Sequence, residues 1–182
     1  MRRRQPLPKV WLMTDPRFGD DLISAIRKLP FGSGVIFRHY HLTIEERHKL
    51  FHKVARTCRQ RGHTVLLAGS ERDALRWHAD GFHQRSTKTS TLIHSSPVHN
   101  RSELVRARRQ NTDMILISPV YTTASHSGVR PLSRFSFNRL AAQAYNMQVI
   151  ALGGVTKRKA LALNSHLVFG WAAIDAFRKT SN

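Results

Sequence analysis

Short apolar runs alternate with segments of helical periodicity along almost the whole chain. Residues 10–14 predict a buried strand, and apolar side chains three and four positions apart at 20–29 predict the helix that follows it. The same alternation then repeats to the end. Strands are predicted at 10–14, 34–38, 63–68, 80–83, 91–94, 113–118, 148–152 and 167–172. Helices are predicted at 20–29, 43–62, 71–77, 100–110 and 133–145, from 156 onwards, and after the last strand.

This repetition, with no linker or change of composition between its parts, predicts one domain over residues 1–182. Eight βα units fit a closed (β/α)8 TIM barrel, and a doubly wound open sheet is the competing α/β fold. The strand count favours the barrel. Because barrels of this type ordinarily need about 250 residues, the helices and loops must be trimmed.

The composition is that of a folded protein outside membranes. Hydrophobic residues make up 41% of the 182 positions, and no apolar run approaches the roughly 20 residues that a membrane span needs. The apolar stretch 10–13 is too short for a signal peptide, and the single cysteine, Cys58, has no intrachain partner. A reducing, cytoplasmic location is therefore expected.

The charge of the chain is strongly positive. Thirty Lys and Arg against eleven Asp and Glu give a formal net charge of +19. Such a surplus attracts anions, whether small phosphates or nucleic acid. The basic residues are spread out, in groups at 2–4, 56–61, 106–109 and 157–159. Dispersed charge indicates a solvated basic surface more than a specific partner, so nucleic-acid binding is kept only as an alternative.

The predicted strand at 148–152 runs directly into two glycines. In a barrel and in an open sheet alike, the site lies beyond the C-terminal ends of the strands. Gly153 and Gly154 stand at such an end, and Thr156 begins the next predicted helix. Glycine lets an anion approach the backbone amides, and a helix N-terminus adds a favourable dipole. A tight turn without a ligand is the alternative interpretation, and the segment alone does not decide between the two.

Four segments follow, in order, the motifs of one known family. They are Val-Ile-Phe-Arg at 35–38, Ala-Asp-Gly-Phe-His at 79–83, Ser-Pro-Val-Tyr-Thr-Thr-Ala-Ser-His at 118–126 and Ala-Leu-Gly-Gly-Val at 151–155. From about residue 10 to the C-terminus the chain resembles the thiamine-phosphate synthase/TenI family, whose members are β/α barrels. It is similar to a divergent member of that family.

The resemblance implies an activity and a set of site residues. The family joins a pyrimidine pyrophosphate to a thiazole phosphate and releases pyrophosphate, so by resemblance the chain is a transferase. Arg38 would hold the pyrophosphate as a fixed fork. Thr123 and Ser125 would offer hydroxyls to a phosphate, with His126 in place of a lysine, and the double glycine would bind the thiazole phosphate. The residues expected to bind substrate or phosphate are Arg38, Thr123, Ser125, His126, Gly153 and Gly154.

The family's Mg²⁺ is held by aspartates and bridges the phosphates of the substrate. Counted back from Ala79, one aspartate position falls on Gly69, and counted on from His83, the second falls on Lys88. Neither residue can ligate a hard cation, so no metal ligand is expected in this chain. Near the last strand Asp175 replaces the family's serine, an acid where phosphate affinity would favour none.

Histidines are frequent at the predicted strand ends. His39, His83, His94, His99 and His126 all fall at or just past such an end. A remodelled site that uses imidazole for proton transfer or for a transition metal is one interpretation. The other is incidental placement, because eleven histidines will put several near any rim. The second interpretation is preferred.

The expected function is binding of a phosphorylated small molecule of thiamine biosynthesis, such as thiazole phosphate or thiamine phosphate, without synthase turnover. An active thiamine-phosphate synthase with a rearranged site is the alternative within the family. A basic nucleic-acid-binding module is the alternative from another class. The oligomeric state stays open, with a homodimer among the options.

Overall fold

Eight parallel strands form the centre of the structure, a computed structural model that describes residues 6–84, 90–122 and 130–178. Each strand pairs with the next along the chain, and the eighth pairs with the first, so the sheet closes into a barrel. This confirms the predicted (β/α)8 barrel and excludes the open sheet. The strands are β1 (Val10–Met13), β2 (Gly34–Phe37), β3 (Thr64–Leu67), β4 (Gly81–His83), β5 (Ile93–Val98), β6 (Met114–Ile117), β7 (Gln148–Leu152) and β8 (Gly170–Ala173).

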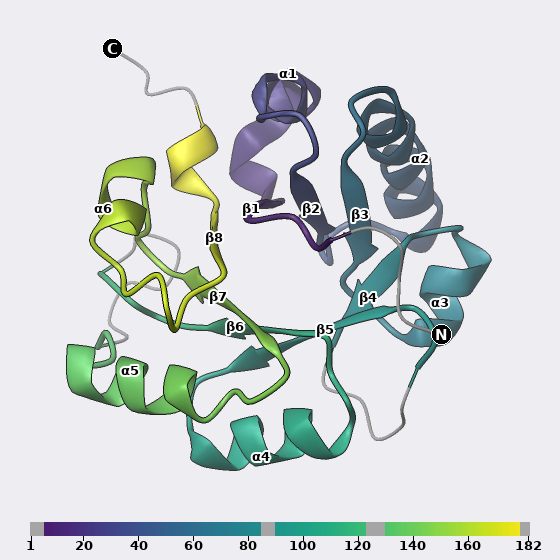
Figure 1. Cartoon of the computed structure of the whole chain (residues 1–182). Coiled ribbons are helices and arrows are strands. Elements are labelled where there is room, and N and C mark those ends of the chain that lie inside the picture. Colours follow the sequence, from purple (N-terminus) through teal and green to yellow (C-terminus); the bar gives the residue numbers. More distant parts are fainter. Residues whose placement is uncertain (1–5, 85–89, 123–129, 179–182) are drawn as a thin grey trace.

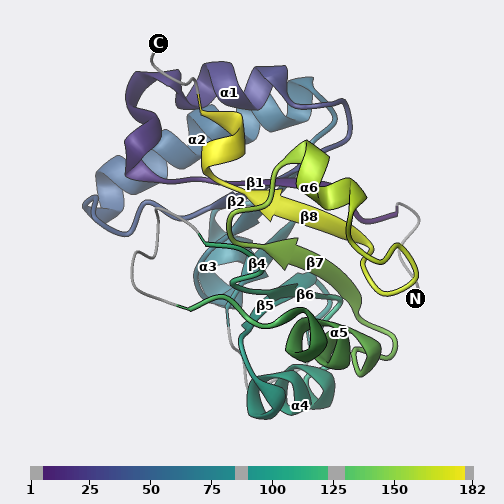
Figure 2. The ribbon, with the colours of Figure 1, turned by 90° about the vertical axis from the view of Figure 1, so that its left-hand side faces the viewer.

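Helices between the strands lie around the outside of the barrel (Figures 1 and 2). They are short, as the length of the chain requires. They are α1 (Leu22–Lys28), α2 (Ile44–Gln60), α3 (Glu71–Arg76), α4 (Arg101–Arg109), α5 (Arg134–Ala142) and α6 (Lys157–Leu161), with 3-10 segments η1 (Pro16–Asp21) and η3 (Asp175–Phe177). Within the described ranges, no helix is long and apolar enough to cross a membrane.

The register of the strands decides which side chains fill the barrel. Trp11 pairs with Gly34 and Met13 with Ile36, so these positions face the interior, while the residues between them face the helices. The Trp11 ring lies where a side chain on Gly34 would be, since a Cβ there would lie 2.1 Å from it. The interior is therefore packed and is not a pore.

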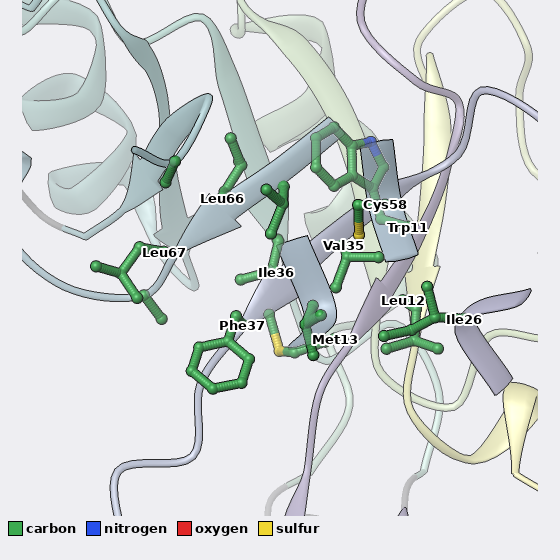
Figure 3. Packing of buried hydrophobic residues seen from close by; sticks show 14 of the residues in the cluster. Trp11, Leu12, Met13, Ile26, Val35, Ile36, Phe37, Cys58, Leu66 and Leu67 are labelled. Carbon is green, nitrogen blue, oxygen red and sulfur yellow. The ribbon is translucent and has the colours of Figure 1, made fainter. Parts of the chain in front are cut away.

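Outward-facing apolar residues attach the helices. Leu12 packs toward Ile26 of α1 in the same buried cluster (Figure 3). Phe37 meets Phe51 of α2 edge to face, with ring centroids 5.4 Å apart, an arrangement that contributes about 1 kcal/mol beyond burial. Cys58 of α2 is fully buried, and this burial raises the pKa of its thiol to about 12, so the cysteine has a packing role.

Two predicted helix starts are confirmed by their caps. Thr43 and Glu46 form the predicted capping box at the start of α2, and Asn100 accepts a hydrogen bond from the Glu103 N–H at the start of α4. Both arrangements satisfy backbone N–H groups that a helix end leaves unpaired.

The end of the chain departs from the prediction. The eighth strand begins at Gly170 and not at 167, because Leu167 and Val168 donate to the Asn164 carbonyl in a turn. The prediction of a helix after the last strand is wrong for the described residues, in which only the short 3-10 segment η3 follows β8. The fifth strand, predicted at 91–94, runs over Ile93–Val98, since its Ser-Ser-Pro stretch pairs with β6 despite its polar character.

Candidate phosphate site at the barrel mouth

All eight strands are parallel, so their C-terminal ends meet at one rim, which is called the mouth below. Arg38 follows β2 directly. Its Nη1 lies 3.2 Å from the Met13 sulfur, which places the guanidinium over the packed interior of the barrel. Its backbone N–H donates to the hydroxyl of buried Thr14 at 2.9 Å. The predicted anion-binding arginine is therefore at the mouth and has a fixed backbone.

The double glycine after β7 forms a turn at the same mouth. Gly153 has a φ of +96° and Gly154 a φ of +62°, conformations that L side chains rarely adopt. A Cβ on Gly153 would lie 2.9 Å from Pro119 Cα, and one on Gly154 would lie 2.3 Å from the Thr122 carbonyl oxygen. Both positions therefore require glycine, because the chain after β6 passes directly against the turn.

Hydrogen bonds hold this turn by its carbonyl groups. The Leu152 carbonyl accepts from Val120 N–H at 2.9 Å, and the Gly153 carbonyl accepts from Tyr121 N–H at 3.0 Å. The amides of Gly153 and Gly154 donate to no group in the described part of the chain, and both residues are partly exposed. Both amides are therefore without a protein acceptor among the described residues, and their binding of a phosphate stays a prediction.

A lysine that the motifs did not single out lies beside the turn. Lys159 Nζ donates to the Gly154 carbonyl at 3.1 Å and lies 4.7 Å from the centre of the Tyr121 ring. It belongs to α6, whose N-cap Thr156 accepts from the Lys159 backbone N–H. In the sequence this lysine was visible only as part of the dispersed basic group at 157–159.

Asp175 lies in an ion-pair cluster and is not an isolated acid. Its Oδ1 is 2.9 Å from Arg17 Nη1 and 3.3 Å from Arg178 Nη1. Arg17 also binds Asp15, with Nε 2.7 Å from Oδ1. Partial burial opposes ionisation of Asp15, but the hydrogen bonds from Arg17 outweigh it and hold the pKa of this carboxyl below its usual value. The expectation that Asp175 weakens phosphate binding did not consider Arg17 and Arg178, whose positive charges accompany this acid.

His83, at the end of β4, lies beside a polar side chain of the neighbouring strand. It pairs with Ser95 in the β4–β5 ladder, and its Nδ1 lies 2.9 Å from the Ser95 hydroxyl. His94 pairs with Phe82 in the same ladder and therefore faces the opposite way, stacked on that ring outside the barrel. Burial lowers the pKa of His94, and its Nε2 lies 2.9 Å from the Gln84 carbonyl oxygen, so its contacts are with the protein itself.

The remaining predicted rim histidines have local roles. His39 is buried, with its Nδ1 3.0 Å from the Thr14 hydroxyl, and burial lowers its pKa to about 4. His99 is 2.9 Å from the Glu103 carboxylate on α4. His126 lies outside the described residues, as do Thr123 and Ser125, so the expectation for this loop stays a prediction.

The described part of the mouth supplies no group of carboxylates suited to Mg²⁺. Gly69, after β3, supplies no ligand atom from a side chain, and Lys88 lies outside the described residues. The carboxylates of Asp15 and Asp175 are bound by arginines. Among the residues with described placement, no three His, Cys, Asp or Glu side chains are grouped to hold a metal ion.

The closed barrel and its glycine turn define a class, the β/α barrels with a candidate anion site after the seventh strand. A family model described as thiamine monophosphate synthase matches residues 12–177, and the chain belongs to this family.

Individual relatives agree with this assignment. "Putative thiamine-phosphate synthase 2" of Aquifex aeolicus (strain VF5) is 27% identical over 184 residues, which cover 94% of this chain and 98% of the relative. The thiamine-phosphate synthase of Bacillus velezensis (strain DSM 23117 / BGSC 10A6 / LMG 26770 / FZB42) is 25% identical over 151 residues, which cover 75% of this chain and 67% of the relative. The solved thiamine phosphate pyrophosphorylase from Pyrococcus furiosus superposes with a TM-score of 0.73 at 18% identity, over 92% of this chain and 86% of its own, and so supports the fold.

Proposed function

We propose that the chain binds a phosphorylated small molecule of thiamine biosynthesis at the barrel mouth and does not turn over as a synthase. The observation that carries the proposal is the turn at Gly153 and Gly154, whose amides point to no protein partner in the described structure. A phosphoryl group would accept from both amides, and the positive charges of Lys159 and Arg38 would favour its negative charge.

The chemistry of the transfer argues against turnover. A pyrophosphate leaving group develops several negative charges, which a dication held by carboxylates neutralises in this type of reaction. Gly69 and Lys88 replace those carboxylates, and Asp15 is already paired with Arg17. A phosphate monoester carries less charge than a pyrophosphate, so binding of a monoester can persist where transfer is lost.

An active synthase with a rearranged site is the second candidate, and one observation favours it. Arg17 and Arg178 meet at Asp175 after β8, and Arg38 follows β2 at the same mouth. Guanidinium groups can neutralise phosphate oxygens by bidentate hydrogen bonds. Three arginines could therefore supply charge that the missing metal does not.

Calorimetric titration with the thiazole phosphate and a pyrophosphate-release assay with both substrates and Mg²⁺ distinguish the candidates. Our proposal predicts saturable binding of the thiazole phosphate and no pyrophosphate release above a blank. Release that depends on the enzyme would establish the second candidate. No binding at all would refute both.

A charge-matched pair of variants gives the control. Arg38→Ala removes a cation at the mouth and should weaken thiazole phosphate binding about 10-fold or more, as loss of a charge-assisted hydrogen bond does. Arg27→Ala removes an exposed cation of α1 and should leave the affinity within about two-fold, because screened charges at a distance contribute little. Equal weakening in both would show that only the net charge matters.

A further inference from the structure

Two histidines of α2 converge on each other beside Trp77, which follows α3. His48 and His52 are four residues apart and so lie on successive turns of one helix face. Their Nε2 atoms are 3.0 Å apart, with ring centroids separated by 4.3 Å. This pair lies outside the barrel mouth and has no part in the proposed phosphate site.

The two nitrogens are arranged as ligands of one metal ion. Imidazole binds Zn²⁺ at about 2.0–2.1 Å, which in a tetrahedral site separates two ligand nitrogens by about 3.3 Å. The observed 3.0 Å is close to that separation, so one ion could replace the proton that the two rings share.

The surroundings restrict the kind of metal. The positive charge of Arg59, further along α2, and the overall charge of +19 disfavour a dication that relies on charge attraction alone. The pair offers nitrogen donors and no carboxylate, a set that suits Cu²⁺, Ni²⁺ and Zn²⁺ and does not suit Mg²⁺ or Ca²⁺. Since the described residues contain no group of three or more His, Cys, Asp or Glu side chains placed for a metal, water must complete the coordination.

We propose that His48 and His52 form a two-histidine site for a borderline transition-metal ion on the side of α2 next to Trp77. Spacing alone, His-x3-His at 48–52, could have indicated it from the sequence. The side-chain geometry adds the convergence of the two Nε2 atoms.

Trp77 provides a direct measurement. Its ring lies 4.9 Å from that of His48, centroid to centroid, so a paramagnetic ion bound by the pair would quench its fluorescence. Trp11 is buried in the barrel and Trp171 stacks on Phe177 after β8, whereas Trp77 contacts His48 directly. Titration of the purified protein with Cu²⁺ should give saturable quenching, and a large excess of Zn²⁺, which takes the same ligands more weakly and is diamagnetic, should reverse it.

Three variants test the site. His52→Gln should raise the half-saturating Cu²⁺ concentration more than about 10-fold. Loss of a partner that only supports a metal ligand already costs about that much, and His52 is itself a ligand in the proposed site. The control His99→Gln removes the histidine that pairs with Glu103 on α4, another i,i+4 arrangement, and should leave the quenching unchanged. Trp77→Phe should remove the quenching while equilibrium dialysis still finds the ion bound.

Quenching with the same midpoint in His52→Gln and the unaltered protein would overturn the proposal, as would the absence of saturable quenching. Cys58 does not confuse the result, because its thiol is buried and its pKa is raised to about 12. His52 is exposed, so the Gln variant is expected to fold normally, and far-UV circular dichroism checks this.

Discussion

Gly154→Ala should damage both the stability and the phosphate affinity of this protein. Gly154 has a φ of +62°, and an added Cβ would lie 2.3 Å from the Thr122 carbonyl oxygen and 2.9 Å from Tyr121 Cβ. Backbone and β-carbon cannot move aside as the end of a flexible side chain can. The segment after β6 would therefore have to shift away from the glycine turn.

Two contributions determine the expected loss of folding stability, and a third effect determines the loss of affinity. An L residue in the left-handed region costs about 1–2 kcal/mol. Overpacking against neighbours that resist displacement adds about 1–3 kcal/mol. Loss of a hydrogen bond to a charged phosphate is worth about 1.5–3 kcal/mol, so the affinity for thiazole phosphate should fall about 10- to 100-fold.

Gly32→Ala is the matched control. Gly32 has a φ of +72°, and a Cβ there would meet nothing within 4 Å. It precedes β2, at the rim opposite the mouth. Urea unfolding should show a loss of about 1–2 kcal/mol, from backbone strain alone, with unchanged thiazole phosphate affinity. Equal unfolding free energies for the two variants, together with full affinity in Gly154→Ala, would refute the reasoning about this turn.

Three further predictions concern charge and protonation. Burial lowers the pKa of His39 from 6.5 to about 4, so between these pH values the unfolded chain binds more protons than the folded protein. The free energy of unfolding should therefore fall as the pH drops from 6.5 to 4, and His39→Asn should flatten this dependence in urea unfolding. Asp175→Asn should remove an acid from the mouth and free Nη1 of Arg17, whose Nε stays on Asp15, and so raise phosphate affinity in calorimetry; the stability change should be below about 1 kcal/mol because the pair is partly exposed. Gly69→Asp with Lys88→Asp should create Mg²⁺-dependent diphosphate affinity; no gain in the same titration would show that the defect lies elsewhere.

The barrel could be predicted from the sequence because most strands are short apolar runs buried on both faces. Met114–Ile117 is the clearest case, with all four residues buried between the barrel interior and the outer helices. The fifth strand was mispredicted because its residues Ser95 and Ser96 are polar, and only the pairing with β6 shows that they belong to a strand. Strand pairing is a long-range property that local patterns do not contain.

The candidate site was predictable in part. Arg38 and the glycine turn follow strand ends, and parallel strands bring such ends to one rim. The pair formed by Arg17 and Asp175 joins residues 158 positions apart, and no local signal indicates it. Which rim histidine faces the mouth depends on the β4–β5 register, so His83 and His94 could not be distinguished by position alone.

Backbone amide NMR during a titration with the thiazole phosphate tests the phosphate site most directly. The amide resonances of Gly153 and Gly154 should move together and saturate at the ligand concentration that calorimetry gives for binding. Saturable shifts in other amides, with these two resonances unmoved, would contradict a phosphoryl group bound at the turn after β7.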